Sequence, residues 1–129
     1  MTTPSVEDSA AKVLRILVVE DNQNLNGMLC DMLELLGHAP QGAGDAEQAL
    51  RLSEQHSFDV LLTDVSLPGI SGIELARQLI VTQPKVQVVF ASGYGAKMMQ
   101  HIKFDSRVLP KPYDLEQIQQ LLRELSGSA

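Results

Sequence analysis

Five polar residues with complementary chemistry follow apolar runs along this 129-residue chain. Glu20 and Asp21 end the first run, Asp64 ends a later one, Ser92 ends another, and Lys111 follows the last. If the runs are parallel strands, their carboxyl ends share one edge of a sheet, and these side chains converge there. Three clustered carboxylates repel one another, which raises their pKa values unless a cation is bound. Their oxygen atoms suit a hard divalent ion, Mg²⁺ or Mn²⁺.

The charges of such a site point to phosphoryl chemistry. A divalent ion and the ammonium of Lys111 balance the three carboxylates, so the site is near neutral and admits a phosphoryl group. A carboxylate can attack phosphorus and form an aspartyl phosphate. The metal and Lys111 would neutralise the transferring oxygens, and Ser92 would donate a hydrogen bond to one of them.

The elements that must position these residues alternate in type along the chain. Apolar runs predict strands at 15–19, 59–65, 86–91 and 107–109, and a weaker one near 38–41. Between them lie patterns with helical spacing, for which Asp45, Ser71 and Asp114 serve as N-caps and Gly37 as a C-terminal stop. A short helix is expected over 95–102. The pattern predicts an α/β fold with a doubly wound parallel sheet.

Length, composition and charge favour a single globular domain that does not bind nucleic acid or membranes. The length and the 44% hydrophobic content fit one globular domain, expected over residues 13–126 with tails at 1–12 and 127–129. A net charge of −6 argues against non-specific binding to nucleic acid or to anionic membranes. The single cysteine, Cys30, excludes an internal disulfide and is expected in the core. The start of the chain does not read as a signal peptide and no apolar stretch reaches membrane-spanning length, so we expect a cytoplasmic protein.

Four segments carry a family resemblance. In chain order they are ILVVEDN (16–22), LTDVSLPGISG (62–72), FASGY (90–94) and LPKPY (109–113). They resemble the signature blocks of response-regulator receiver domains of two-component signalling, and the likeness covers residues 13 to about 126. It implies a flavodoxin-like (βα)5 receiver fold with five parallel strands and a fourth helix that is short or mobile.

The resemblance also implies a role for each site residue. Asp64 matches the phosphoacceptor, and Glu20 and Asp21 match the acidic pair that binds the metal, with Asp21 as the direct ligand. The backbone carbonyl of Ser66 would be a further metal ligand. Ser92 matches the switch hydroxyl.

Around Lys111, which matches the family's lysine, the resemblance has one departure. The Lys111–Pro112 peptide is expected to be cis. The family's switch aromatic usually lies three residues before the lysine, where this chain has Val108. The FASGY run followed by PKPYD is similar to the FAT GUY-like subgroup of single-domain receivers, which has Thr at the position of Ser92.

Three functions remain to be separated. In the first, a sensor histidine kinase, a hybrid kinase or a phosphotransfer protein phosphorylates Asp64, which switches a contact with a downstream protein. The second is a degenerate receiver that acts as a docking module. The third is a phosphohydrolase with an aspartyl nucleophile, but such enzymes carry a second Asp where this chain has Ser66. We expect no enzymatic turnover beyond weak autodephosphorylation, and either a stand-alone regulator or an excised receiver of a hybrid kinase.

The remaining candidates are expected to have structural or incidental roles. Tyr113 is assigned to packing or to an interaction surface. The turn residues Pro68, Gly69 and Gly72 carry no chemistry. The histidines show no metal-ligand spacing and are interpreted as incidental surface residues: His38, His56 and His101.

Overall fold

The computed structural model describes residues 12–93 and 102–125. Five parallel strands form one sheet in the order β2-β1-β3-β4-β5. The strands are β1 (Arg15–Val19), β2 (Ala39–Ala43), β3 (Val60–Asp64), β4 (Gln87–Ser92) and β5 (Arg107–Pro110). The helices are α2 (Gln23–Leu35), α3 (Ala46–Gln55), α4 (Gly72–Thr82) and α5 (Leu115–Leu125). The predicted doubly wound parallel sheet is confirmed.

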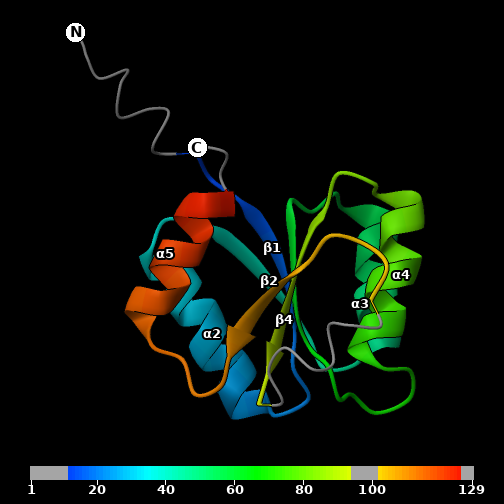
Figure 1. Ribbon diagram of the computed structural model, residues 1–129, viewed down its shortest axis with the longest axis horizontal. Helices are drawn as coiled ribbons and strands as arrows, with labels where there is room; N and C mark the ends of the chain where they lie inside the picture. The colour runs from blue at the N-terminus through cyan, green and yellow to red at the C-terminus, as the bar shows by residue number, and fades with distance from the viewer. Residues whose placement is uncertain (1–11, 94–101, 126–129) are drawn as a thin grey trace, which may run out of the picture.

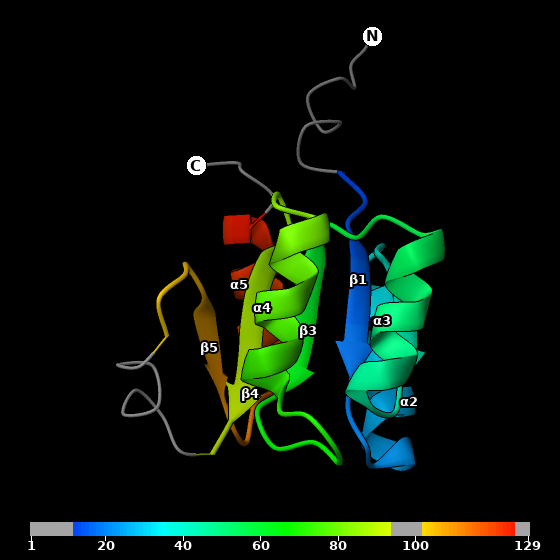
Figure 2. The ribbon, with the colours of Figure 1, turned by 90° about the vertical axis from the view of Figure 1, so that its right-hand side faces the viewer.

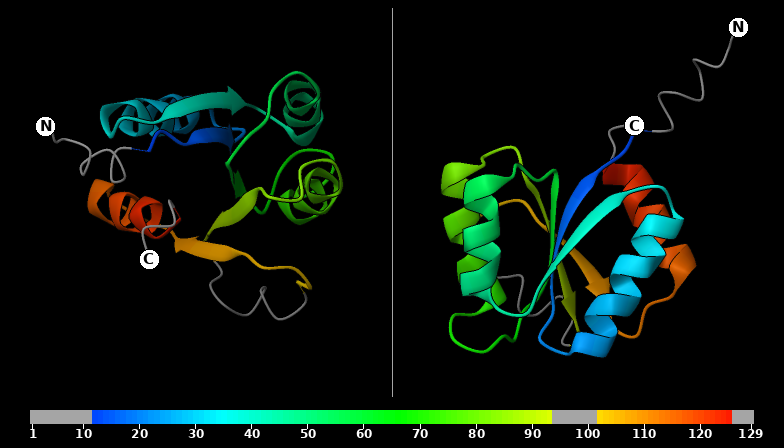
Figure 3. Two further views of the ribbon diagram at one scale, coloured as in Figure 1. Left: turned by 90° about the horizontal axis from the view of Figure 1, so that it is seen from above. Right: turned by 180° about the vertical axis from the view of Figure 1, so that it is seen from behind.

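The helices cover both faces of the sheet. Helices α2 and α5 lie on one face and α3 and α4 on the other, which gives three layers (Figure 1; Figure 3, left). Seen across α3 and α4, strands β1, β3, β4 and β5 run in one direction (Figure 2). The chain passes from β1 outward to β2 and then returns to β3 on the other side of β1. The strand order therefore reverses between β1 and β3, where ligand sites form in such sheets.

The strands bury both of their faces, as their continuous apolar runs predict. In β1, Leu17 and Val19 belong to the core under α3 and α4, whereas Ile16 and Val18 belong to the core under α2 and α5. All four side chains are at most 1% exposed. Complete burial of a side chain of this size stabilises a fold by roughly 1.5–3 kcal/mol. These apolar layers hold the strand ends in fixed positions.

Side-chain caps determine where the helices begin. Asn22, Asp45 and Ser71 each accept a hydrogen bond from the main-chain N–H three residues later. Asp114 accepts from the N–H of Gln117, whose side chain in turn accepts from the N–H of Asp114, forming a reciprocal capping box. The three N-caps predicted from the sequence are confirmed.

Three expectations differ from the structure. Strand β2 lies one to two residues further along than predicted, because pairing with β1 rather than apolar composition sets its ends. His38 is not an incidental surface residue, since its half-buried ring accepts a hydrogen bond from the N–H of Leu14 through Nδ1 at 3.1 Å. Cys30 is half-buried against the core rather than inside it.

Other expectations fall where the structure is not described. The short helix expected over 95–102 lies outside the described residues except for Ile102. The same holds for His101 and for the two tails, apart from Lys12. Within residues 12–93 and 102–125, no helix is long and apolar enough to cross a membrane.

Candidate functional site

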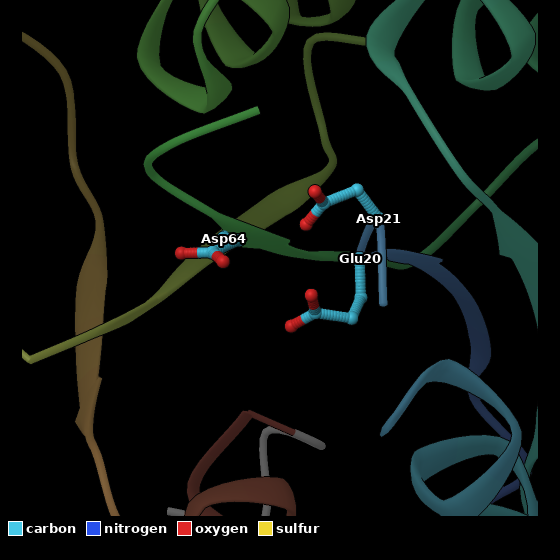
Figure 4. Close-up of side chains that lie close together, drawn as sticks. All are labelled: Glu20, Asp21 and Asp64. Carbon is cyan, nitrogen blue, oxygen red and sulfur yellow. The ribbon is translucent and has the colours of Figure 1, made fainter. Parts of the chain in front are cut away.

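Three carboxylates meet at the carboxyl ends of β1 and β3. Glu20 and Asp21 follow the last residue of β1, and Asp64 is the last residue of β3. The two strands are neighbours in the sheet, with Val19 opposite Thr63. One oxygen from each carboxylate lies within 4.8 Å of the others (Figure 4). The convergence expected from the sequence is therefore present.

Lys111, which follows the edge strand β5, adds a positive charge to the three carboxylates. Its Nζ donates a hydrogen bond to Asp64 Oδ2 at 3.2 Å and lies 3.7 Å from Glu20 Oε1. The main-chain N–H of Lys111 donates to the carbonyl of Ser92 at 3.0 Å, which ties this residue to the end of β4. The Lys111–Pro112 peptide is cis, as expected.

Glu20 is the most enclosed of the three acids. Its side chain is 6% exposed, against 17% for Asp64, and Asp21 is exposed. Burial raises the pKa of the Glu20 carboxyl and the charge of Asp64 raises it further. The N–H of Asn22 and the ammonium of Lys111 lower that pKa but do not cancel the effect. Three carboxylates share the single ammonium of Lys111, and their hard oxygen donors fit Mg²⁺.

Ser92 and Ser66 occupy the positions that the sequence indicates. Ser92 is the last residue of β4, is 4% exposed, and directly follows Ala91, the residue paired with Asp64. Ser66 lies two residues beyond Asp64 in the exposed loop that leads to α4. Ser92 is therefore next to the strand position opposite Asp64, and Ser66 follows Asp64 closely along the chain.

Gly72 has a tighter role than the turn assigned to it from the sequence. It is the first residue of α4, and its N–H donates to the carbonyl of Val65 at 2.8 Å. A Cβ at this position would lie 2.0 Å from the carbonyl oxygen of Asp64 and 3.0 Å from Oγ1 of Thr63. Helix α4 can therefore approach the main chain of Asp64 this closely only with glycine at its start.

Tyr113 belongs both to the packing and to the site. It packs against the core under α2 and α5. Burial, with the nearby charges of Glu20 and Asp64, raises the pKa of the Tyr113 phenol to about 12. At neutral pH Tyr113 thus contributes a protonated hydroxyl in the electric field of the two acids.

The departure at Val108 is visible in the structure. Val108 is half-buried in β5, opposite Phe90 of β4. The aromatic neighbour of Phe90 is instead Phe104, with ring centroids 6.3 Å apart. An aromatic side chain is therefore present before β5, four residues earlier than the family pattern has it.

Asn26 contacts the site although its residue pattern was not used to predict it. This half-buried residue of α2 donates hydrogen bonds from Nδ2 to the carbonyls of Glu20, at 3.1 Å, and Ala43, at 3.0 Å. A signal was available, because Asn26 stands three and seven residues before Leu29 and Leu33, on the buried face of the helix. A polar residue at such a position needs a hydrogen-bond partner.

Known proteins resemble this chain in sequence. The family model for the response regulator receiver domain matches residues 16–123. The response regulator receiver protein CpdR of Brucella abortus is 30% identical over 107 residues, which are 81% of this chain and 89% of CpdR. The virulence sensor protein BvgS of Bordetella pertussis is 42% identical over 82 residues, or 64% of this chain. This chain spans only 6% of the length of BvgS.

A solved structure agrees in the fold. The receiver domain of the sensor histidine kinase PA1611 from Pseudomonas aeruginosa PAO1 has a TM-score of 0.78 at 26% identity, covering 91% of this chain and 100% of that one. That domain was solved with a magnesium ion coordinated in its active-site cleft. Membership of the FAT GUY-like subgroup stays a prediction, since Tyr94 lies outside the described residues. The strand order and acidic cluster of this chain, together with the family match, show that it belongs to the response regulator receiver domains of two-component signalling.

Proposed function

We propose that the chain accepts a phosphoryl group on Asp64 in a two-component system or phosphorelay, with Mg²⁺ or Mn²⁺ bound beside it. The metal ligands would be Asp21, Asp64 and the carbonyl of Ser66, with Glu20 completing the acidic pair. The observation that carries the proposal is the hydrogen bond from Lys111 to Asp64 beside two further carboxylates. This arrangement supplies a nucleophile, a cation site and a fixed positive charge at one place.

The reaction follows from these positions. A carboxylate oxygen of Asp64 forms a bond to phosphorus as the bond from phosphorus to the imidazole nitrogen of a donor phosphohistidine breaks. The electron pair of the broken bond stays on that nitrogen, and the ring, protonated on its other nitrogen, leaves as neutral imidazole. When bound, a divalent ion would neutralise negative charge on the phosphoryl group. Lys111 turns its ammonium toward a phosphoryl oxygen, and the Ser92 hydroxyl donates to another.

Relatives suggest the partners. BvgS is a sensor protein, and the PA1611 receiver is part of a sensor histidine kinase. The donor is therefore a sensor histidine kinase, a hybrid kinase or a phosphotransfer protein, and the phosphorylated form changes a contact with a downstream protein. The receiver unit is residues 13–126, acting in the cytoplasm without binding nucleic acid or membrane.

The hydrolase alternative gains no support from the site. Ser66 stands where a phosphohydrolase of this type has its acidic proton donor, and its hydroxyl cannot act as a strong general acid at neutral pH. The docking alternative is separated from phosphorylation by the test below.

The test is phosphoryl labelling by a cognate kinase or by acetyl phosphate with Mg²⁺. We expect Asp64→Asn to abolish the label, because the amide is not a nucleophile, and Asp31→Asn, at an exposed position on α2, to keep it. Full labelling of Asp64→Asn would refute the assignment. If wild-type chain took no label and Mg²⁺ with beryllofluoride left its NMR spectrum unchanged, the chain would be a docking module.

A further inference from the structure

We infer that Asn26 is a positioning residue of the metal site, and that its side-chain amide holds the Glu20–Asp21 main chain in the geometry that binds the cation. This inference rests on the proposed function, because it concerns the ligands of the proposed metal. Asn26 lies in the first turns of α2 and is not itself a ligand in the proposal.

The contacts of Asn26 use its whole amide. Nδ2 donates to the carbonyls of Glu20 and Ala43, which are at the ends of β1 and β2. Two carbonyl oxygens face the same amide atom, so that atom must be the nitrogen. On the other side, Oδ1 accepts from the thiol of Cys30 at 3.6 Å. The side chain is therefore held in one orientation.

The position of Asn26 follows from where the sheet stops. The last pair of the β1–β2 ladder is Val19 with Ala43, after which the N–H of Glu20 still donates to the carbonyl of Ala43 at 3.1 Å. In a continued parallel ladder, the next donor to the carbonyl of Glu20 would be the N–H of Asp45. Asp45 instead becomes the N-cap of α3. The amide of Asn26 donates at the place where the ladder would have continued.

The hydrogen bond from Asn26 orients the peptide between Glu20 and the proposed metal ligand Asp21. The carbonyl of Glu20 belongs to the same planar peptide unit as the N–H of Asp21, so a hydrogen bond to it sets the direction in which the exposed Asp21 side chain leaves the backbone. The Glu20 carboxylate is separately held, because Oε2 accepts from the N–H of Asn22 at 3.0 Å. Asn26 thus orients the main chain between Glu20 and Asp21, whereas the N–H of Asn22 holds the Glu20 carboxylate.

Gly42 provides an independent way to disturb Asn26. A Cβ on Gly42 would lie 2.3 Å from Oδ1 of Asn26 and 3.2 Å from its Cγ. The amide cannot yield without losing its two hydrogen bonds to main-chain carbonyls. Gly42→Ala should therefore displace the amide although residue 26 is unchanged.

The experiment is a calorimetric titration with MgCl₂ of the whole chain and of four variants, with unfolding in EDTA measured alongside. Asn26→Leu keeps the shape of the side chain and removes its donor, while Asn24→Leu is the matched control on an exposed residue of the same helix. Gly42→Ala and the double variant Asn26→Ala/Gly42→Ala complete the set, and the double variant keeps the test open if Asn26→Leu does not fold.

We expect Asn26→Leu to weaken Mg²⁺ binding by roughly 10- to 100-fold, as loss of a residue that orients a metal ligand does. Saturating Mg²⁺ should restore most of the labelling rate with acetyl phosphate. Gly42→Ala should weaken binding similarly, and Asn26→Ala/Gly42→Ala should be no weaker than Gly42→Ala alone, because both changes disturb the same contact.

Two results would overturn the inference in different ways. If Asn26→Leu lowered stability in EDTA but bound Mg²⁺ as Asn24→Leu does, Asn26 would be structural only, and the proposed function would stand. If the folded wild-type chain bound no Mg²⁺, the proposed function would fail, and this inference with it.

Discussion

The ammonium of Lys111 lies between two carboxylates of unequal burial. It is hydrogen-bonded to Asp64 and more distant from Glu20, at 3.2 and 3.7 Å. Its side chain is 30% exposed, so the charge is only partly screened by water. In the proposal the ammonium acts on the phosphoryl group and not on the metal, and these two roles can be separated by mutation.

Lys111→Met should therefore lower phosphoryl labelling while preserving Mg²⁺ binding. Loss of one fixed charge on the transferring oxygens costs roughly 10²- to 10³-fold in rate. Removal of a cation from the acidic cluster makes the cluster more negative, so Mg²⁺ should bind at least as tightly. Labelling rates and a Mg²⁺ titration measure the two effects, and the exposed Lys85→Met serves as the control. A parallel loss of metal affinity would show that Lys111 supports the metal site instead.

The sequence indicated where the charged residues and Ser92 lie, but it did not indicate Asn26 or the position of Tyr113 near the acids. Glu20, Asp64 and Lys111 stand at strand ends, where a change from apolar to charged residues is visible in the sequence alone. Asn26 acts through hydrogen bonds to the ends of two strands, and Tyr113 lies in the electric field of Glu20 and Asp64; both positions depend on the packing of α2 and of the chain after β5. Such contacts cannot be derived from local patterns.

At the scale of elements, α4 contacts the end of β3 at its start and the end of α3 at its finish. Its first residue, Gly72, lies against the main chain of Asp64. At its other end the side chain of Gln83 accepts from the N–H of Phe58 at 2.7 Å and donates to the carbonyls of Ser53 and His56. The helix therefore fixes the start of the loop from α3 and the end of β3 together. Gln83 lies outside the apolar pattern of α4, so this role could not be predicted from the pattern.

Two Gly→Ala substitutions should have opposite effects on stability. In Gly72→Ala, the added Cβ meets backbone that cannot move aside, so we expect a loss of roughly 1–3 kcal/mol in the free energy of unfolding and weaker labelling. In Gly27→Ala, the Cβ would meet nothing within 4 Å on α2, and a gain of roughly 0.5–1 kcal/mol is expected from helix propensity. Denaturant unfolding of both variants measures the difference. Equal stabilities would contradict the close approach at Gly72.

At the scale of the whole molecule, one histidine links stability to pH. His38 accepts the N–H of Leu14 through Nδ1, which it can do only when that nitrogen carries no proton. Burial lowers the pKa of His38 in the folded state. Because the unfolded chain then takes up the proton more readily, the contribution of His38 is complete above the unfolded pKa of about 6.5 and is lost as the pH falls below it.

We therefore expect the free energy of unfolding to fall between about pH 7 and pH 5, and to fall less in His38→Asn. The Asn side chain offers a similarly placed oxygen that does not titrate in this range. The exposed His56→Asn is the matched control and should follow the wild-type profile. Urea unfolding across the pH range measures the slopes, and parallel slopes for wild type and His38→Asn would contradict the role of the hydrogen bond.

The overall architecture was predictable because its signals repeat. Apolar runs at four strands and caps such as Ser71 at the helix starts agree with one another, and together they allow few topologies. Strand β2, with the sequence APQGA, lacks such a signal and exists because β1 offers it a ladder of hydrogen bonds. Partner strands of this kind are decided by tertiary pairing and not by local preference.

The two outer strands of the sheet share one further property. The N–H of Ala39 and the N–H of Lys111 both donate inward to neighbouring strands, so the alternation of a parallel ladder turns Pro40 of β2 and Pro110 of β5 toward the open edges. A proline has no N–H to offer an incoming strand. Each margin therefore offers an incoming strand one hydrogen-bond donor fewer, which opposes growth of the sheet into a polymer.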